Sequence, residues 1–186
     1  MACAALPGRA RWSSTPAPAC SASTRAPSSP AFFQTEAYAR GIIGFWREFH
    51  RIPDDVEEAV RFRLERARRV MHAGKRIVVV LAENAIRTRY CAEHDEQLVK
   101  LLSVRALPYV SLGIIPLGTL VRCTGAGTGF WIYDNSAVYL ESPSAEIKVT
   151  RPGEIDIYAR VFAHLQSVAV YGRDARRIIT RALDDS

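Results

Sequence analysis

The chain has 186 residues, a formal net charge of +6 and four widely spaced cysteines. This length predicts one domain, or one domain with a tail, and the absence of a Cys-x-x-Cys pair argues against a disulfide framework or a zinc site. No stretch approaches the roughly 20 apolar residues needed to cross a bilayer, so we expect a cytoplasmic protein with reduced thiols, no membrane contact, no metal and no cofactor.

The first 33 residues differ sharply in composition from the rest. They contain 20 Ala, Ser or Pro, three Arg and no Asp or Glu. Such a segment buries too little apolar surface to offset its chain entropy, so we predict a disordered tail over 1–33 and a domain over 34–186. A transit peptide, or translated sequence upstream of the domain, are further interpretations. Without the tail, 22 basic and 19 acidic residues remain, an ordinary charge for a domain.

Two helices are predicted directly after the tail. Thr35 is a good N-cap, and the helix it begins continues to about His50 with apolar residues at three- and four-residue steps. These residues are Tyr38, Ile42, Phe45 and Phe49. The second helix runs from Asp54 to about Ala73, and Gly74 is placed to close it.

The middle of the chain contains the predicted strands. A continuous β-branched run over 77–81 indicates a buried strand. A short helical turn over 83–90 and a helix over 93–106 separate it from a second strand over 110–115, and this strand–helix–strand unit predicts a parallel pair. Three short strands follow, at 129–133, 137–141 and 145–149. Asp134-Asn135-Ser136 suits a hairpin turn between the first two, so these strands indicate an antiparallel meander.

Two more helices complete the chain. Thr150 is the expected cap of a helix that reaches about Tyr171, with Pro152 tolerated in its first turn. Gly172 is expected to end this helix, and a last helix covers 174–183. We therefore predict a mixed α/β (α+β) fold, in which a single domain has a small mixed sheet of about five strands packed with about five helices.

No motif in the chain specifies a reaction. It has no Gly-x-Ser-x-Gly elbow and no cysteine beside a candidate base, and Cys91 with His94 supplies at most half of a metal site. The glycine-rich segment 124–129 precedes an aromatic, strand-like run rather than a helix, so a strand connection is favoured over a phosphate loop.

Two carboxylates have positions that suit a ligand site. Glu83 and Glu141 each lie at or just past the end of a predicted buried strand, where ligand crevices form in α/β sheets. They would support acid–base chemistry if they faced each other within about 5–10 Å, whereas a structural role, for example beside Arg87, is commoner. The candidate ligand- or partner-binding residues are Glu83, Arg87, Trp131, Tyr133 and Glu141.

The second predicted helix is rich in arginine. Its five arginines are Arg61, Arg63, Arg66, Arg68 and Arg69. Three glutamates offset them, and Glu57–Arg61 and Glu65–Arg69 have the favourable i,i+4 spacing. A solvated, salt-bridged face is therefore favoured over a nucleic-acid contact.

Four segments together resemble a known family. They are 33–40 (FQTEAYAR), 63–66 (RLER), 80–87 (VLAENAIR) and 107–116 (LPYVSLGIIP). In order and spacing they resemble the domain of unknown function that follows the helix-turn-helix in actinobacterial Xre-family regulators, a group also described as antitoxin-like. The resemblance covers about 34–183.

This resemblance implies a cytoplasmic transcriptional regulator whose C-terminal domain is non-catalytic and senses a ligand, binds a small partner protein or forms a homodimer. In such regulators the helix-turn-helix precedes the segment that begins here at Gln34. Residues 1–33 are too short for that module and carry five prolines, so DNA binding is expected only through a missing helix-turn-helix and no residue here is assigned to DNA. The alternatives are a hydrolase-like enzyme that uses Glu83 and Glu141, or a stand-alone partner-binding module.

Overall fold

A six-stranded mixed sheet forms the centre of the protein in a computed structural model, which describes residues 20–23, 29–51, 55–121, 129–141 and 145–186. The strands are β1 (Cys20–Ser23), β2 (Ile77–Ala82), β3 (Val110–Ile115), β4 (Phe130–Tyr133), β5 (Ala137–Glu141) and β6 (Glu146–Val149). Their order across the sheet is β3-β2-β1-β4-β5-β6. The strands β1, β2 and β3 are parallel, and β1, β4, β5 and β6 pair antiparallel in succession. Both the predicted parallel pair and the predicted meander are confirmed.

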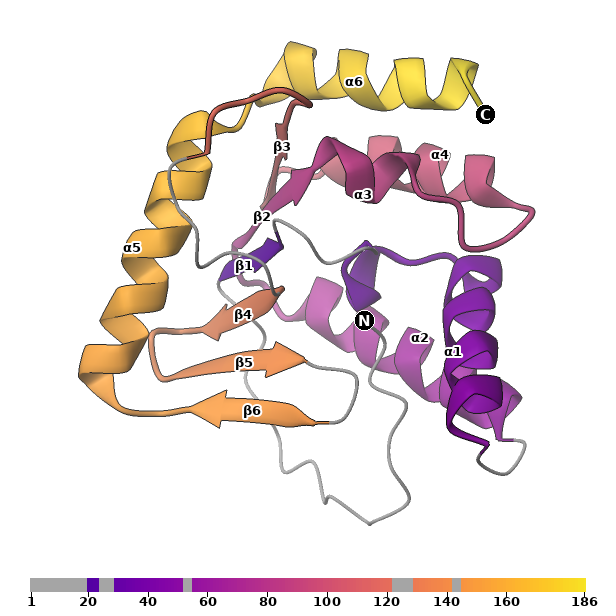
Figure 1. The fold of residues 1–186 in the computed structure, drawn as a ribbon, viewed down its shortest axis with the longest axis horizontal. Coiled ribbons are helices and arrows are strands. Elements are labelled where there is room, and N and C mark those ends of the chain that lie inside the picture. The colour runs from indigo at the N-terminus through magenta and orange to yellow at the C-terminus, as the bar shows by residue number, and fades with distance from the viewer. Residues whose placement is uncertain (1–19, 24–28, 52–54, 122–128, 142–144) are drawn as a thin grey trace.

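Helices cover both faces of this sheet (Figure 1). They are the 3-10 helix η1 (Ala31–Phe33) and the α-helices α1 (Glu36–His50), α2 (Val56–His72), α3 (Glu83–Arg87), α4 (His94–Arg105), α5 (Pro152–Val168) and α6 (Gly172–Asp184). The mixed α+β class is confirmed. The described part of the chain has one strand and one α-helix more than the approximate numbers predicted from the sequence.

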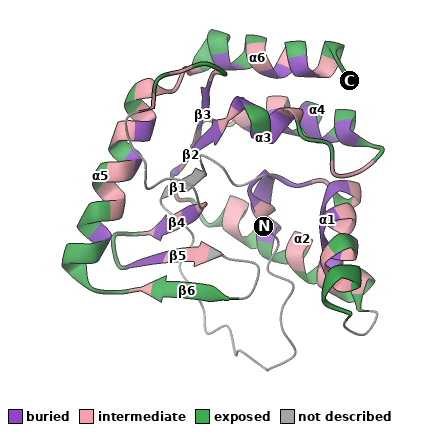
Figure 2. Ribbon diagram, viewed as in Figure 1, coloured by how far each residue is buried: buried purple, intermediate pink, exposed green. Residues whose placement is uncertain are grey.

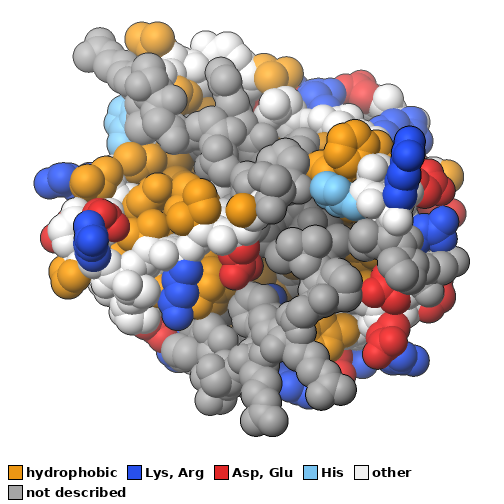
Figure 3. Space-filling view, turned by 60° about the horizontal axis from the view of Figure 1, so that its bottom comes forward, with side chains coloured by type: hydrophobic (Ala, Val, Ile, Leu, Met, Phe, Trp, Pro, Cys, Tyr) orange, Lys and Arg blue, Asp and Glu red, His pale blue; other side chains and the backbone are white. Residues whose placement is uncertain are grey.

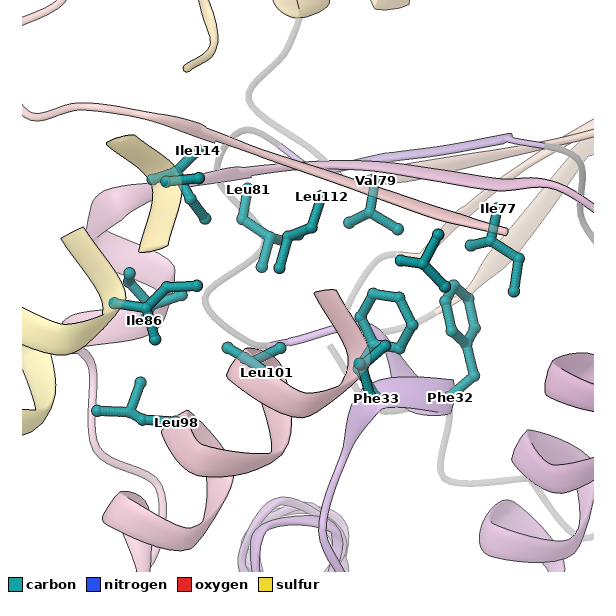
Figure 4. Packing of buried hydrophobic residues seen from close by; sticks show 14 of the residues in the cluster. Phe32, Phe33, Ile77, Val79, Leu81, Ile86, Leu98, Leu101, Leu112 and Ile114 are labelled. Atoms are coloured by element: carbon teal, nitrogen blue, oxygen red, sulfur yellow. The ribbon is translucent and has the colours of Figure 1, made fainter. Parts of the chain in front are cut away.

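Alternate residues of the strands build two separate cores. On one face of β2, Ile77, Val79 and Leu81 pack against η1, α4 and α6 (Figure 4). On the opposite face, Val80 packs with Phe162 and other apolar residues of α5. Because both faces are covered, β2 and β3 are almost continuously buried, as the β-branched run of β2 predicted. Figure 2 shows this burial concentrated in the middle of the fold.

The predicted boundary between disorder and fold at Gln34 is wrong. Residues 20–23 form β1, which lies between β2 and β4 and joins the two halves of the sheet. Phe32 and Phe33 are buried in the core that also contains Ile77. Composition misled the prediction because sheet pairing uses backbone groups, which any residue except proline supplies in full, and the partners of β1 lie far away in sequence. Residues 1–19 and 24–28 lie outside the described part of the chain.

Local signals placed most of the helices correctly. The Thr35 side chain caps α1 by accepting the N–H of Tyr38 at 3.3 Å, and Gly74 follows α2 with a φ of +68°. The helix expected to reach Tyr171 ends earlier, at Val168, and its N-cap is Arg151 rather than Thr150. It ends because the N–H and C=O of Val170 both bond to Ile114 of β3, at 2.8 and 2.9 Å.

The predicted hairpin turn between β4 and β5 is also confirmed. Asp134 and Asn135 both adopt left-handed conformations, with φ of 48° and 54°. The N–H of Ser136 donates to the carbonyl of Tyr133 at 2.8 Å. Two successive left-handed residues match the right-handed twist of the flanking strands, which is why Asp and Asn suit this position.

Candidate functional site

Glu83 is a buried carboxylate at the junction of β2 and α3, and its two oxygens have different partners. One accepts from Arg87 Nε at 2.8 Å, and the other accepts from the backbone N–H of Leu117, just past β3, at 2.9 Å. Arg87 Nη1 also donates to Asp185 at 2.9 Å, and these contacts raise the pKa of the Arg87 guanidinium. Glu83 and Arg87 therefore connect α3, the segment after β3 and the end of α6.

Glu141 lies at a distance from this network. It is the last residue of β5, which is separated from β2 by β1 and β4. Neighbouring strands lie about 4.8 Å apart, so β2 and β5 are separated by about 14 Å. A pair of catalytic carboxylates needs roughly 5–10 Å. The fold does not bring the backbones of Glu83 and Glu141 within that range.

Trp131 and Tyr133 occupy alternate positions on β4. Trp131 is half-buried and packs edge-on against Phe32, with ring centroids 5.5 Å apart. Tyr133 packs against Tyr139 at 5.1 Å, and its hydroxyl accepts from Arg66 of α2 at 3.5 Å. Trp131 thus contributes to the core, whereas Tyr133 contributes to a partly exposed row of side chains on β4 and β5.

The five candidate residues do not converge on one site. Trp131 pairs with Ser21, which pairs in turn with Val79 of β2, and Tyr133 lies two residues further toward the start of β2. Glu83 follows the end of β2. Along the strand direction, Tyr133 and Glu83 are therefore six residues apart, or roughly 20 Å. Each group consequently has to be interpreted separately.

Residues of the family-like segment 33–40 form a buried hydrogen-bond network. The Gln97 side chain of α4 acts like a strand neighbour: its Oε1 accepts from Thr35 N–H at 2.8 Å and its Nε2 donates to Phe33 C=O at 3.0 Å. The Gln34 side chain donates to Ser29 C=O at 2.7 Å. The bonds of Gln97 join the chain just before α1 to α4. This part of segment 33–40 therefore has a structural role.

Tyr38 completes the network from the first turn of α1. Its hydroxyl accepts from the backbone N–H of Ser29 at 3.1 Å. Burial raises the pKa of this hydroxyl, so it stays protonated and neutral. Gln34 Oε1 accepts in addition from Arg63 of α2 at 3.1 Å, which brings the second helix into the same network.

The second half of α1 carries an exposed aromatic cluster along the apolar stripe predicted from periodicity. The predicted stripe is buried only at Tyr38 and Ile42, whereas the side chains of Phe45 and Phe49 are 56% and 63% exposed. The first half of α1 is buried because it packs closely on the fold. A Cβ at Gly41 would lie 2.3 Å from the Tyr90 carbonyl oxygen. Figure 2 shows α1 changing from buried to exposed along its length.

We call Phe45, Trp46, Phe49 and His50 the α1 aromatic patch. Phe45 and Phe49 stack with centroids 5.8 Å apart, and Trp46 stacks on His50 at 5.2 Å. Edge contacts of 5.2 and 5.5 Å join Trp46 to Phe45 and Phe49. The side chains therefore hold one another in place on a single helix while their outer surfaces stay exposed. Their chemistry suits binding of an apolar surface, with no reactive group beyond the His50 imidazole.

Helix α2 carries both arginine and glutamate side chains. Arg69 pairs with Glu65, as their spacing predicted, and Glu57 pairs with Arg40 of α1 at 2.8 Å. On the face drawn in Figure 3, basic and acidic side chains are interspersed between separate hydrophobic groups. The Glu65–Arg69 pair matches the salt-bridged face predicted for α2.

Two other kinds of site have no candidate among the described residues. Among the described residues, no three His, Cys, Asp or Glu side chains are grouped so that they can hold a metal ion. The described helices also include none with the length and apolar character needed to cross a membrane.

The fold and the site together define a mixed α+β domain. Hydrogen bonds join the segment before α1 to α4, and the second half of α1 presents an exposed aromatic surface. A protein-family model, a domain of unknown function named DUF5753, matches residues 23–181. The chain belongs to this family, and the match begins within β1, in agreement with a folded region that starts before Gln34. No curated protein and no solved structure matches the chain.

Proposed function

We propose that this chain is a non-catalytic regulatory domain that binds a small partner protein through the α1 aromatic patch. We place it among antitoxin-like transcriptional regulators of the Xre type. The resemblance of segments 33–40, 63–66, 80–87 and 107–116 to such regulators supports this context. The observation that carries the proposal is the α1 aromatic patch itself, because clustered exposed aromatic side chains mark surfaces that bind other proteins.

The size of the patch suits a small partner. Burial of a fully exposed phenylalanine stabilises a complex by about 1.5–3 kcal/mol. Phe45 and Phe49 retain over half of their exposure, so each can contribute roughly 1 kcal/mol. The ring contacts within the patch already restrict the side chains, which reduces the entropy lost on binding.

The first test is a binding measurement with a matched control. Tagged protein is expressed in its own host, the co-purifying partner is identified and produced separately, and its affinity is measured by calorimetry. We expect the double variant Phe45→Ala/Phe49→Ala to weaken binding by roughly 10- to 30-fold, the equivalent of about 1.4–2 kcal/mol. The control is Phe62→Ala, because Phe62 is 53% exposed on α2 and lies outside the patch.

A second measurement addresses regulation. Transcript levels are compared between strains that carry Phe45→Ala/Phe49→Ala and Phe62→Ala at the chromosomal locus. We expect a defined set of transcripts to change only with the double variant. Equal partner affinity for both variants, or identical transcript levels, would contradict the proposal.

A further inference from the structure

The two edges of the sheet differ. At one edge, β3 is partly closed because Ile114 bonds through both its N–H and its C=O to Val170. At the other edge, β6 pairs with β5, and no other strand of the described part of the chain pairs with it. Figure 1 shows β6 as the outermost strand of the β4–β5–β6 meander. An open edge presents unpaired backbone donors and acceptors to a further strand.

The sequence of β6 is complementary to itself in one antiparallel register. The strand reads Glu146-Ile147-Lys148-Val149. If two copies meet about a two-fold axis at Ile147, Glu146 of each copy lies opposite Lys148 of the other. Residues directly opposite in an antiparallel pair have Cβ atoms about 4.5–5.5 Å apart, and opposite charges there are stabilising. The charges of β6 therefore favour pairing with a second copy in this register.

The side chains also separate correctly between the two faces. Ile147 pairs with Leu140, whose side chain packs on the core under α5. Ile147 itself is 52% exposed. In the two-fold register Ile147 of each copy covers the other. Lys148 is on the opposite face, 5.6 Å from the centre of the Tyr139 ring, and Glu146 shares that face by strand alternation.

We propose that β6 pairs antiparallel with β6 of a second copy, so that one continuous sheet crosses a homodimer. A lone lysine on an edge strand normally discourages such pairing, but here Glu146 of the second copy neutralises it. The contact is short compared with the roughly 800 Å² per partner of a standard interface. We therefore expect a weak dimer whose population rises with protein concentration, formed by a surface distinct from the α1 aromatic patch.

The test uses charge reversal and mixing in sedimentation velocity experiments. Lys148→Glu places Glu146 opposite a glutamate of the second copy, and Glu146→Lys places Lys148 opposite a lysine. Each variant alone is expected to associate at least tenfold more weakly than the wild-type chain. An equimolar mixture of the two variants restores both opposite-charge pairs, so we expect it to form a heterodimer with roughly wild-type affinity.

Two further variants control for indirect effects. Lys100→Glu changes an exposed charge on α4 and is expected to leave association unchanged. Lys148→Gln removes the contact with Tyr139 without creating repulsion, so it is expected to associate more strongly than Lys148→Glu. Circular dichroism verifies that every variant is folded, and the mixture gives a positive result that misfolded variants cannot produce.

Three outcomes would overturn the proposal. The first is a wild-type chain that stays monomeric at its highest soluble concentration. The second is a mixture of the two charge variants that associates no better than each variant alone. The third is loss of the dimer in Phe45→Ala/Phe49→Ala with no effect of Lys148→Glu, which would show that the copies meet through α1 instead.

Discussion

At the scale of single residues, close approaches of the backbone to neighbouring groups restrict which side chains fit. Gly113 in β3 is the clearest case, because a Cβ there would lie 2.6 Å from the Tyr171 ring. Tyr171 immediately follows Val170, the residue that bonds to Ile114. The absence of a side chain at Gly113 thus allows the connection between α5 and α6 to lie directly on the sheet.

We expect Gly113→Ala to lower the free energy of unfolding by about 1–3 kcal/mol, because the new methyl group must displace the Tyr171 ring. The control is Gly44→Ala in α1, where a Cβ meets nothing within 4 Å. That change is expected to be neutral or to stabilise by up to about 1 kcal/mol through helix propensity. Urea unfolding measures both variants, and equal midpoints would contradict the role assigned to Tyr171.

At the scale of elements, one amide side chain joins α4 to the segment before α1. Gln97 bonds to Thr35 N–H and to Phe33 C=O, across more than 60 residues of sequence. The backbone groups it bonds lie at the end of η1 and at the N-cap of α1. Periodicity places Gln97 on a helix, but it does not show that the Gln97 side chain bonds to backbone groups as a neighbouring strand would.

We expect Gln97→Leu to destabilise the protein by roughly 2–4 kcal/mol, because it removes both bonds and leaves an N–H and a C=O with reduced hydrogen bonding. Hydrogen exchange should increase most at Phe33 and Thr35. Lys100→Gln, an exposed change three residues along α4, serves as the control. Unchanged exchange at Thr35 in Gln97→Leu would show that the network is dispensable.

At the scale of the whole molecule, the N-terminal region completes the fold. β1 separates β2 from β4, so the parallel and antiparallel halves form one sheet through it. Phe32 and Phe33 join the same core as the strands and α4 (Figure 4). Loss of this region would leave two strand edges unpaired and a gap in the core.

We expect a chain that begins at Gln34 to be insoluble or to lack a cooperative unfolding transition. The same chain begun at residue 20 should unfold cooperatively.

A milder change is Phe33→Ala in the full chain. It is expected to lower the free energy of unfolding by about 3–5 kcal/mol, the usual cost of deleting a buried ring. Thermal unfolding monitored by circular dichroism measures all three. A stable, cooperative domain from Gln34 onward would contradict the central place of β1.

The sequence by itself determined the local elements and the fold class. Caps such as Thr35, breakers such as Gly74 and the β-branched run of β2 act over a few residues, so they can be recognised without knowledge of the fold. The parallel strand–helix–strand unit followed from the same local information. The contact of Glu83 with Arg87 also follows from local sequence, because i,i+4 spacing on a helix brings two such side chains together.

Only the tertiary structure decided which residues are exposed and which distant segments meet. Periodicity shows that Phe45 and Phe49 share a stripe, but it does not show that the two residues stay exposed. Pairing of β1 with β2 and β4 is likewise a backbone interaction between segments far apart in the chain, which composition does not encode. The same reason separates Glu83 from Glu141, because strand order, rather than position at a strand end, sets the distance between them.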